Sequence, residues 1–125
     1  MNVHTELRDA VLYATADGEM DFDSCIRIFE RLANLAAESQ LLKILFEGLL
    51  LTGDLPDIDR INLAVKTTDY LKQLGIHPTI AVVGNPPTFN GLAVLAAQSV
   101  GADVQLFPGI QDAIEWLNQS PNLPR

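Results

Sequence analysis

Apolar residues follow two different periods along this chain, and the alternation of the two predicts the order of its elements. Short apolar and β-branched runs indicate strands, which we place at residues 3–6, 10–16, 43–47, 79–84 and 103–107. Longer segments with apolar residues three and four positions apart predict helices over residues 21–40, 54–75, 85–101 and 110–119. The first two strands should form a hairpin through a turn at residues 7–9. Helices and strands alternate after it, which predicts an α/β fold with a mixed, mostly parallel sheet of about five strands and about four helices.

Capping residues indicate where these helices begin and end. Small polar side chains favour the position before a helix, proline its first turn, and glycine the position just after its end. On this basis the predicted starts are Asp21 or Asp23 for the first helix, Asp54 with Pro56 for the second and Asn85 with Pro86 for the third, and the predicted ends of the second and third are Gly75 and Gly101.

The length and composition are those of one globular domain. We expect residues 1–119 of the 125 to form it and the tail, residues 120–125, to fray. Every unbroken apolar stretch falls short of the ~20 residues that a membrane span needs, and no signal peptide is recognisable. The single cysteine, Cys25, has apolar neighbours and is expected to be buried. A cytoplasmic location is the expectation that follows.

The net charge of −8 excludes several classes of partner. Nucleic acids and anionic membranes both require clustered lysine and arginine. The eight basic residues here are scattered and never adjacent. Binding to nucleic acid is therefore not expected.

Three segments resemble one protein family. They are "LYATADGEMDFDS" at the second strand, "IAVVGN" at the fourth strand and "DVQLFPGIQDAIEWL" at the end. With the order of elements, they resemble the SpoIIAA-like (STAS-like) group of small bacterial proteins, where STAS denotes the sulfate-transporter and anti-sigma-factor-antagonist domain. The resemblance implies a STAS-like fold and a non-enzymatic interaction or regulatory module.

The resemblance also implies a position for a regulatory loop. In anti-sigma antagonists the loop after the third strand carries a phosphorylatable serine, and the matching segment here is Thr52, Gly53 and Asp54. No serine occurs between Gln40 and Pro78. We therefore favour a turn followed by an Asp54 cap over a phosphorylation switch, and a ligand- or partner-binding loop that is not phosphorylated remains open.

The segment "VVGNPPTFNG" supplies a second candidate binding loop, at Gly84 and Asn85. A glycine loop that opens a helix can hold phosphate, but both the dinucleotide and the Walker spacings are missing. Neither histidine has metal ligands at a suitable spacing, and the acidic turn "DGEMDFD" does not match a calcium loop. We assign no catalytic residue, no cofactor and no metal.

Three functions of different classes remain. The first is a module that binds another protein or a second copy of itself. The alternative is a carrier or sensor of a small apolar, lipid-like ligand, for which "GLLLTGDL" would supply an apolar loop. The third is an unrecognised enzyme. The surplus of apolar residues in residues 49–51 and 89–100 predicts a homodimer or a higher oligomer built from dimers.

Overall fold

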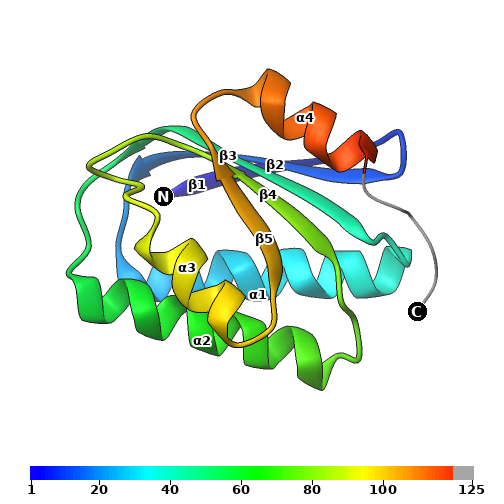
Figure 1. Cartoon of the computed structure of the whole chain (residues 1–125), viewed down its shortest axis with the longest axis horizontal. Helices are drawn as coiled ribbons and strands as arrows, with labels where there is room; N and C mark the ends of the chain where they lie inside the picture. Colours follow the sequence, from blue (N-terminus) through cyan, green and yellow to red (C-terminus); the bar gives the residue numbers. More distant parts are fainter. Residues whose placement is uncertain (120–125) are drawn as a thin grey trace.

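A computed structural model describes residues 1–119, which form five strands and four helices (Figure 1). The elements in chain order are β1 (Asn2–Arg8), β2 (Val11–Glu19), α1 (Phe22–Ser39), β3 (Lys43–Thr52), α2 (Asp57–Gln73), β4 (Thr79–Val83), α3 (Leu92–Ser99), β5 (Asp103–Phe107) and α4 (Ile110–Gln119). The expectation of a frayed tail at residues 120–125 lies outside the described residues.

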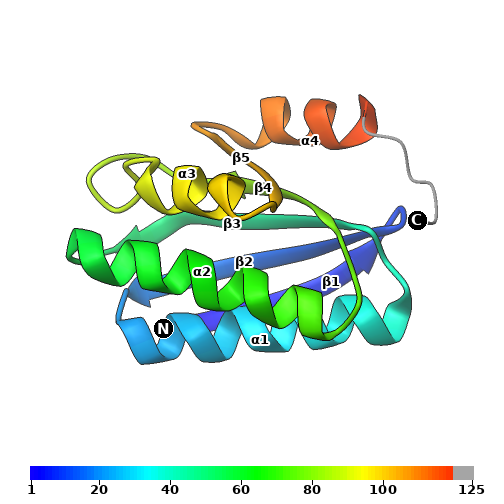
Figure 2. The same ribbon diagram turned by 60° about the horizontal axis from the view of Figure 1, so that its bottom comes forward.

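The strands form one mixed sheet in the order β1-β2-β3-β4-β5. β1 is antiparallel to β2, and every later neighbouring pair is parallel. Each parallel strand pairs with the strand before it in sequence, so right-handed crossovers place all the connecting helices on the same face. Figures 1 and 2 show α1, α2 and α3 on that face and α4 on the opposite one. The predicted fold class, α/β with a mostly parallel sheet, is confirmed.

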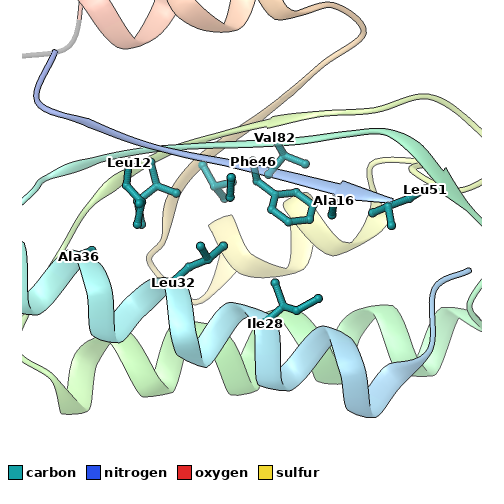
Figure 3. Close-up of a cluster of buried hydrophobic side chains, with 11 residues drawn as sticks. Leu12, Ala16, Ile28, Leu32, Ala36, Phe46, Leu51 and Val82 are labelled. Atoms are coloured by element: carbon teal, nitrogen blue, oxygen red, sulfur yellow. The ribbon is translucent and has the colours of Figure 1, made fainter. Parts of the chain in front are cut away.

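The larger hydrophobic core lies between the sheet and α1 (Figure 3). Its members alternate along the strands and recur every three or four residues along the helix, as burial of one face requires. They include Leu12, Ala16, Ile28, Leu32, Ala36, Phe46, Leu51 and Val82. A second core joins the opposite face of the sheet to α4 through Val11, Leu45, Ala81, Val83, Ala113 and Leu117.

The helix ends confirm three of the predicted caps. Asp21 accepts a hydrogen bond from the backbone N–H of Ser24 at 2.8 Å, and this bond lowers the pKa of the Asp21 carboxyl. Gly75 and Gly101 follow the ends of α2 and α3 with φ angles of +72° and +102°, which favour glycine.

The third strand is longer than the predicted 43–47, because it continues past a β-bulge. Thr15 pairs with Glu47 but Asp17 pairs with Leu50, so two residues of β3 oppose one of β2. The strand continues to Thr52. Leu51 is then buried, while Leu49 and Leu50 expose 40% and 66% of their surface, which the three consecutive leucines had implied.

The prediction that Asp54 caps the second helix is wrong. The helix begins at Asp57, and the preceding residue, Pro56, makes no side-chain cap. Leu55 precedes a proline, and steric contact with the proline ring keeps such a residue out of helical geometry. Residues 54–56 therefore stay outside the helix, and the Asp54 carboxylate contacts the Arg60 side chain instead of a helix end.

The third helix also begins later than predicted. Residues 85–91 form a loop that contains a cis Pro86–Pro87 bond, and α3 begins at Leu92 after Gly91. The reason is again steric, because Pro86 would be the first helical residue but precedes Pro87. Gly91, with a φ of +86°, then lies immediately before the helix. Asn85 and Pro86 thus do not open this helix.

The hairpin turn lies at Asp9 and Ala10, two residues that connect the Arg8–Val11 pair. Both have positive φ, at 53° and 62°, which is the geometry of a type I′ turn.

In the described chain, residues 1–119, we find no helix with the length and apolar character of a membrane span.

Candidate functional site

The loops that follow β3, β4 and β5 meet at the carboxyl-terminal edge of the parallel strands. In open α/β sheets this edge is where binding sites usually form. All the candidate binding residues derived from the sequence belong to it, namely Thr52, Gly53, Asp54, Gly84 and Asn85. The edge therefore brings together two segments that lie about thirty residues apart in the chain.

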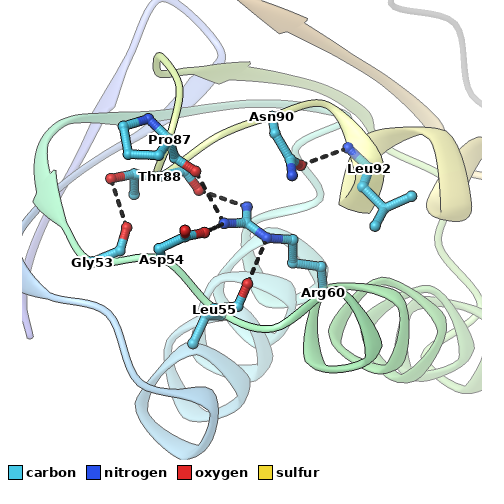
Figure 4. Close-up of polar contacts among 8 residues, drawn as sticks. All are labelled: Gly53, Asp54, Leu55, Arg60, Pro87, Thr88, Asn90 and Leu92. Atoms are coloured by element: carbon cyan, nitrogen blue, oxygen red, sulfur yellow. Dashed lines mark hydrogen bonds and ion pairs between the residues drawn. The ribbon is translucent and has the colours of Figure 1, made fainter.

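Arg60, in the first turn of α2, joins two of these loops (Figure 4). Its side chain exposes only 5% of its surface. Its nitrogens donate to Leu55 O at 2.9 Å (Nε), Thr88 O at 2.7 Å (Nη1), and Asp54 Oδ1 at 2.6 Å and Pro87 O at 3.0 Å (Nη2). Thr88 Oγ1 adds a hydrogen bond to Gly53 O at 2.9 Å. We call Asp54, Leu55, Arg60, Pro87 and Thr88 the Arg60 junction.

The Arg60 junction is built to hold two loops in one arrangement. A buried guanidinium is costly unless its N–H groups are bonded, and here three of its bonds go to backbone carbonyls of the two loops. The Asp54 side chain is 69% exposed, so the ion pair lies at the surface and the carboxylate remains accessible. The loops after β3 and β4 therefore present a defined surface.

Sequence reasoning missed Arg60, although a signal was present. The residue lies three and four positions before Leu63 and Ala64, both buried, so it occupies the inward stripe of α2. A charged residue in that stripe requires buried partners. Asp54 and Leu55 are near Arg60 in sequence, but Pro87 and Thr88 lie 27 and 28 residues away, so the pattern could locate the cation but not all of its acceptors.

The other candidate residues lie at the same edge but have different contacts. Thr52 is exposed, and its hydroxyl donates to Gly18 O at 3.3 Å. Gly53 adopts a φ of +103°, which favours glycine. Asn85 Nδ2 donates to Pro108 O at 3.4 Å, in the loop after β5. The structure thus connects Gly53 and Asp54 to the loop after β4, and turns Asn85 toward a third loop.

Gly84 provides space for an aromatic ring. A Cβ atom at Gly84 would lie 2.1 Å from Phe89 Cδ2, and one at Gly48 would lie 2.6 Å from Phe89 Cζ. The ring of Phe89 therefore packs directly on the backbone of β3 and of the β4 end. This contact fixes the course of the loop that carries Thr88.

Apolar side chains are exposed beside the junction, on the first turns of α2. Ile58 exposes 62% of its surface and Ile61 exposes 37%. Asp57 immediately precedes Ile58, and Asp59 lies between the two isoleucines. Ile58 and Ile61 are thus apolar side chains exposed to solvent among acidic ones.

An apolar cavity of about 120 Å³ lies behind the junction, between α2, α3 and the sheet. Its walls include Leu63, Leu71, Ile80, Val94, Ala97 and Val104, together with Arg60 and Thr88.

Within residues 1–119 no group of three or more histidine, cysteine, aspartate or glutamate side chains could hold a metal ion. The polar chemistry of the described edge is therefore the ion pair of the Arg60 junction and the hydroxyl and amide groups around it.

No family model and no curated protein matches this chain. Solved structures do match it. An anti-sigma factor antagonist from Mycobacterium paratuberculosis is similar over 94% of each chain, with a TM-score of 0.64 and 15% sequence identity. The anti-sigma factor antagonist SpoIIAA, in its unphosphorylated form, is similar over 97% of this chain and 100% of its own, with a TM-score of 0.57 and 14% identity.

These similarities confirm the fold that the resemblance of the sequence motifs implied. Both matched structures are similar over nearly the whole length of the chain, and both are described as anti-sigma factor antagonists. At these identities the likeness concerns the fold. The chain therefore folds as a STAS-like domain of the SpoIIAA type.

Proposed function

We propose that this protein is a non-enzymatic regulatory module that binds another protein through the edge formed by the loops after β3 and β4. The observation that carries the proposal is the Arg60 junction, which fixes both loops beside the exposed Ile58 and Ile61. The fold shared with two anti-sigma factor antagonists supports a regulatory role. Thr52, Gly53, Asp54, Gly84 and Asn85 are proposed as the loop residues that shape the docking surface, and residues 1–119 as one domain.

We further propose that the loop after β3 works without phosphorylation. No serine is present between Gln40 and Pro78, and the Thr52 hydroxyl already donates to the Gly18 carbonyl. Intact-mass and peptide analysis of the protein purified from its native cells should show no phosphate on Thr52. Stoichiometric phosphate at that residue would overturn this part of the proposal.

The docking surface can be tested with a matched pair of variants. Ile58 and Leu95 have nearly equal exposure, at 62% and 63%, but only Ile58 lies beside the junction. Affinity capture from native cells should recover a partner with the wild type and with Leu95→Glu, and lose it with Ile58→Glu. A partner that Ile58→Glu retains and Leu95→Glu loses would place the docking surface elsewhere.

A second candidate function is favoured by the cavity behind the junction. The protein would then sense a small apolar molecule, and docking would respond to it. The supporting observation is a space of about 120 Å³ with apolar walls, next to the residues that hold the docking loops. Native mass spectrometry at graded activation energies tests this function, because a sensor should carry a small co-purified mass.

A further inference from the structure

Helix α3 covers the sheet without burying any of its own residues. The side chains that it directs to the cavity are small, with Ala93, Val94 and Ala97 in the wall. On the opposite side, Ile80 of the interior strand β4 also lines the cavity and is only partly buried. The space exists because the α3 side chains that face it are short, and larger apolar residues at these positions would fill it.

The wall has only four polar side chains, and three of them, Arg60, Thr68 and Thr88, already donate hydrogen bonds to the protein. Thr68 Oγ1 donates to Ala64 O at 2.8 Å, and Thr88 Oγ1 donates to Gly53 O at 2.9 Å. Every nitrogen of the Arg60 guanidinium is bonded to the junction. A trapped water needs about two to four polar partners, so these walls favour an apolar occupant over water.

The volume limits the size of that occupant. Sites for drug-sized ligands measure about 300–1,000 Å³, more than twice the 120 Å³ present here. An apolar cavity of about 150 Å³ made by mutation in another protein stays dry and binds benzene or xenon. An extended lipid is therefore too large for this space.

We propose that the cavity under α3 is a binding site for a compact, uncharged apolar molecule of about the size of benzene. The inference rests on the second proposed function, ligand sensing, and adds to it the place and the size of the ligand. It also replaces the lipid-like ligand expected from the sequence with a smaller one.

The same geometry provides a route from the ligand to the docking loops. Arg60 and Thr88 belong to both the cavity wall and the Arg60 junction. A molecule in the cavity would pack against both and oppose the opening of the junction. Binding and docking are then thermodynamically coupled, because each favours the same closed arrangement.

Benzene is a suitable probe, titrated into the full-length ¹⁵N-labelled protein and followed by amide and arginine side-chain resonances. Saturable shifts should centre on the cavity residues, and exchange of the Arg60 Nε–H with solvent should slow. Ala97→Leu fills the cavity and should weaken binding by at least about tenfold. Ala96→Leu makes the same change on the same helix outside the cavity wall, and should stay within about twofold of the wild type.

Val94→Ala provides a variant that enlarges the cavity and covers the case in which Ala97→Leu fails to fold. It should still bind benzene and also accept a bulkier probe, naphthalene, that the wild type rejects. Equal binding of benzene by Ala97→Leu and Ala96→Leu would mean that the ligand binds elsewhere. That result would overturn the inference but not the proposal that the protein senses an apolar molecule. Absence of saturable shifts in both the wild type and Val94→Ala would overturn the cavity site and the sensing function together, whereas the capture experiment tests docking independently.

Discussion

At the scale of single residues, Cys25 shows how burial determines reactivity. Its side chain is 1% exposed and packs with Leu55 and Leu63. Burial raises the pKa of the thiol from 9.0 to about 11, so the nucleophilic thiolate is scarce at neutral pH. We expect a thiol reagent to modify the native protein far more slowly than the urea-unfolded protein at about pH 8. Equal rates would show that the thiol is accessible.

The same shift predicts a direction for stability at alkaline pH. The folded thiol keeps its proton up to about 11, whereas the unfolded thiol loses it near 9.0. The contribution of Cys25 is therefore complete below the lower value and decreases as pH rises toward the higher one. Cys25→Ser lacks this titration. Urea unfolding of this variant and of the wild type across that pH range therefore separates the contribution of Cys25 to the free energy of unfolding from that of other groups.

The hairpin turn contains an avoidable cost at Ala10. An alanine with φ of 62° is in the left-handed region, which costs a non-glycine residue about 1–2 kcal/mol. Glycine removes that cost but raises the entropy of the unfolded chain, so Ala10→Gly should stabilise the protein by about 0.5–1 kcal/mol. Chemical denaturation provides the measurement. A loss of stability would mean that the turn relaxes in solution to a different geometry.

At the scale of elements, the contact between Phe89 and two glycines holds the loop after β4 to the sheet. Gly84→Ala would place a methyl group 2.1 Å from the ring and should cost about 1–3 kcal/mol, because the ring must move. Gly109→Ala is the matched control. A Cβ there meets nothing within 4 Å, so its effect should stay within about 0.5 kcal/mol. Thermal unfolding of both variants compares them, and equal stabilities would contradict the packing.

The sequence pattern predicted every helix and strand but not all of their limits. Periodicity identifies an element because one face is buried, and this signal is strong in α1 and in the strands. The late starts of α2 and α3 come from steric exclusion by Pro56 and Pro87, which a capping rule alone does not weigh. The length of β3 depends on a bulge, which is a property of the pairing with β2.

The candidate site was predictable in part for the same reason. The ends of parallel strands meet at one edge, so Gly53, Asp54 and Gly84 could be placed together. The role of Arg60 depends on the backbone carbonyl groups of Pro87 and Thr88. Because every residue has such a group, the sequence does not indicate which ones accept a hydrogen bond. The cavity was also beyond reach, because it results from the packing of three separate elements.

At the scale of the whole molecule, exposed apolar residues predict self-association. Leu49 and Leu50 expose 40% and 66% of their surface. We expect light scattering across a dilution series to give the mass of a dimer, because covering such residues removes apolar surface from water. Leu50→Lys should shift the equilibrium toward the monomer. A monomer mass for the wild type at micromolar concentration would contradict the prediction.

The strand order β1-β2-β3-β4-β5 has a consequence for folding during synthesis on the ribosome. Each new strand pairs with the strand synthesised just before it, so the sheet can extend at one edge as the chain emerges. The helices on the first face are complete before β5, but α4 is made last and alone covers Val11, Leu45, Ala81 and Val83. A nascent chain that stalls before Ile110 would therefore display a bare apolar face, which is the kind of surface that chaperones recognise.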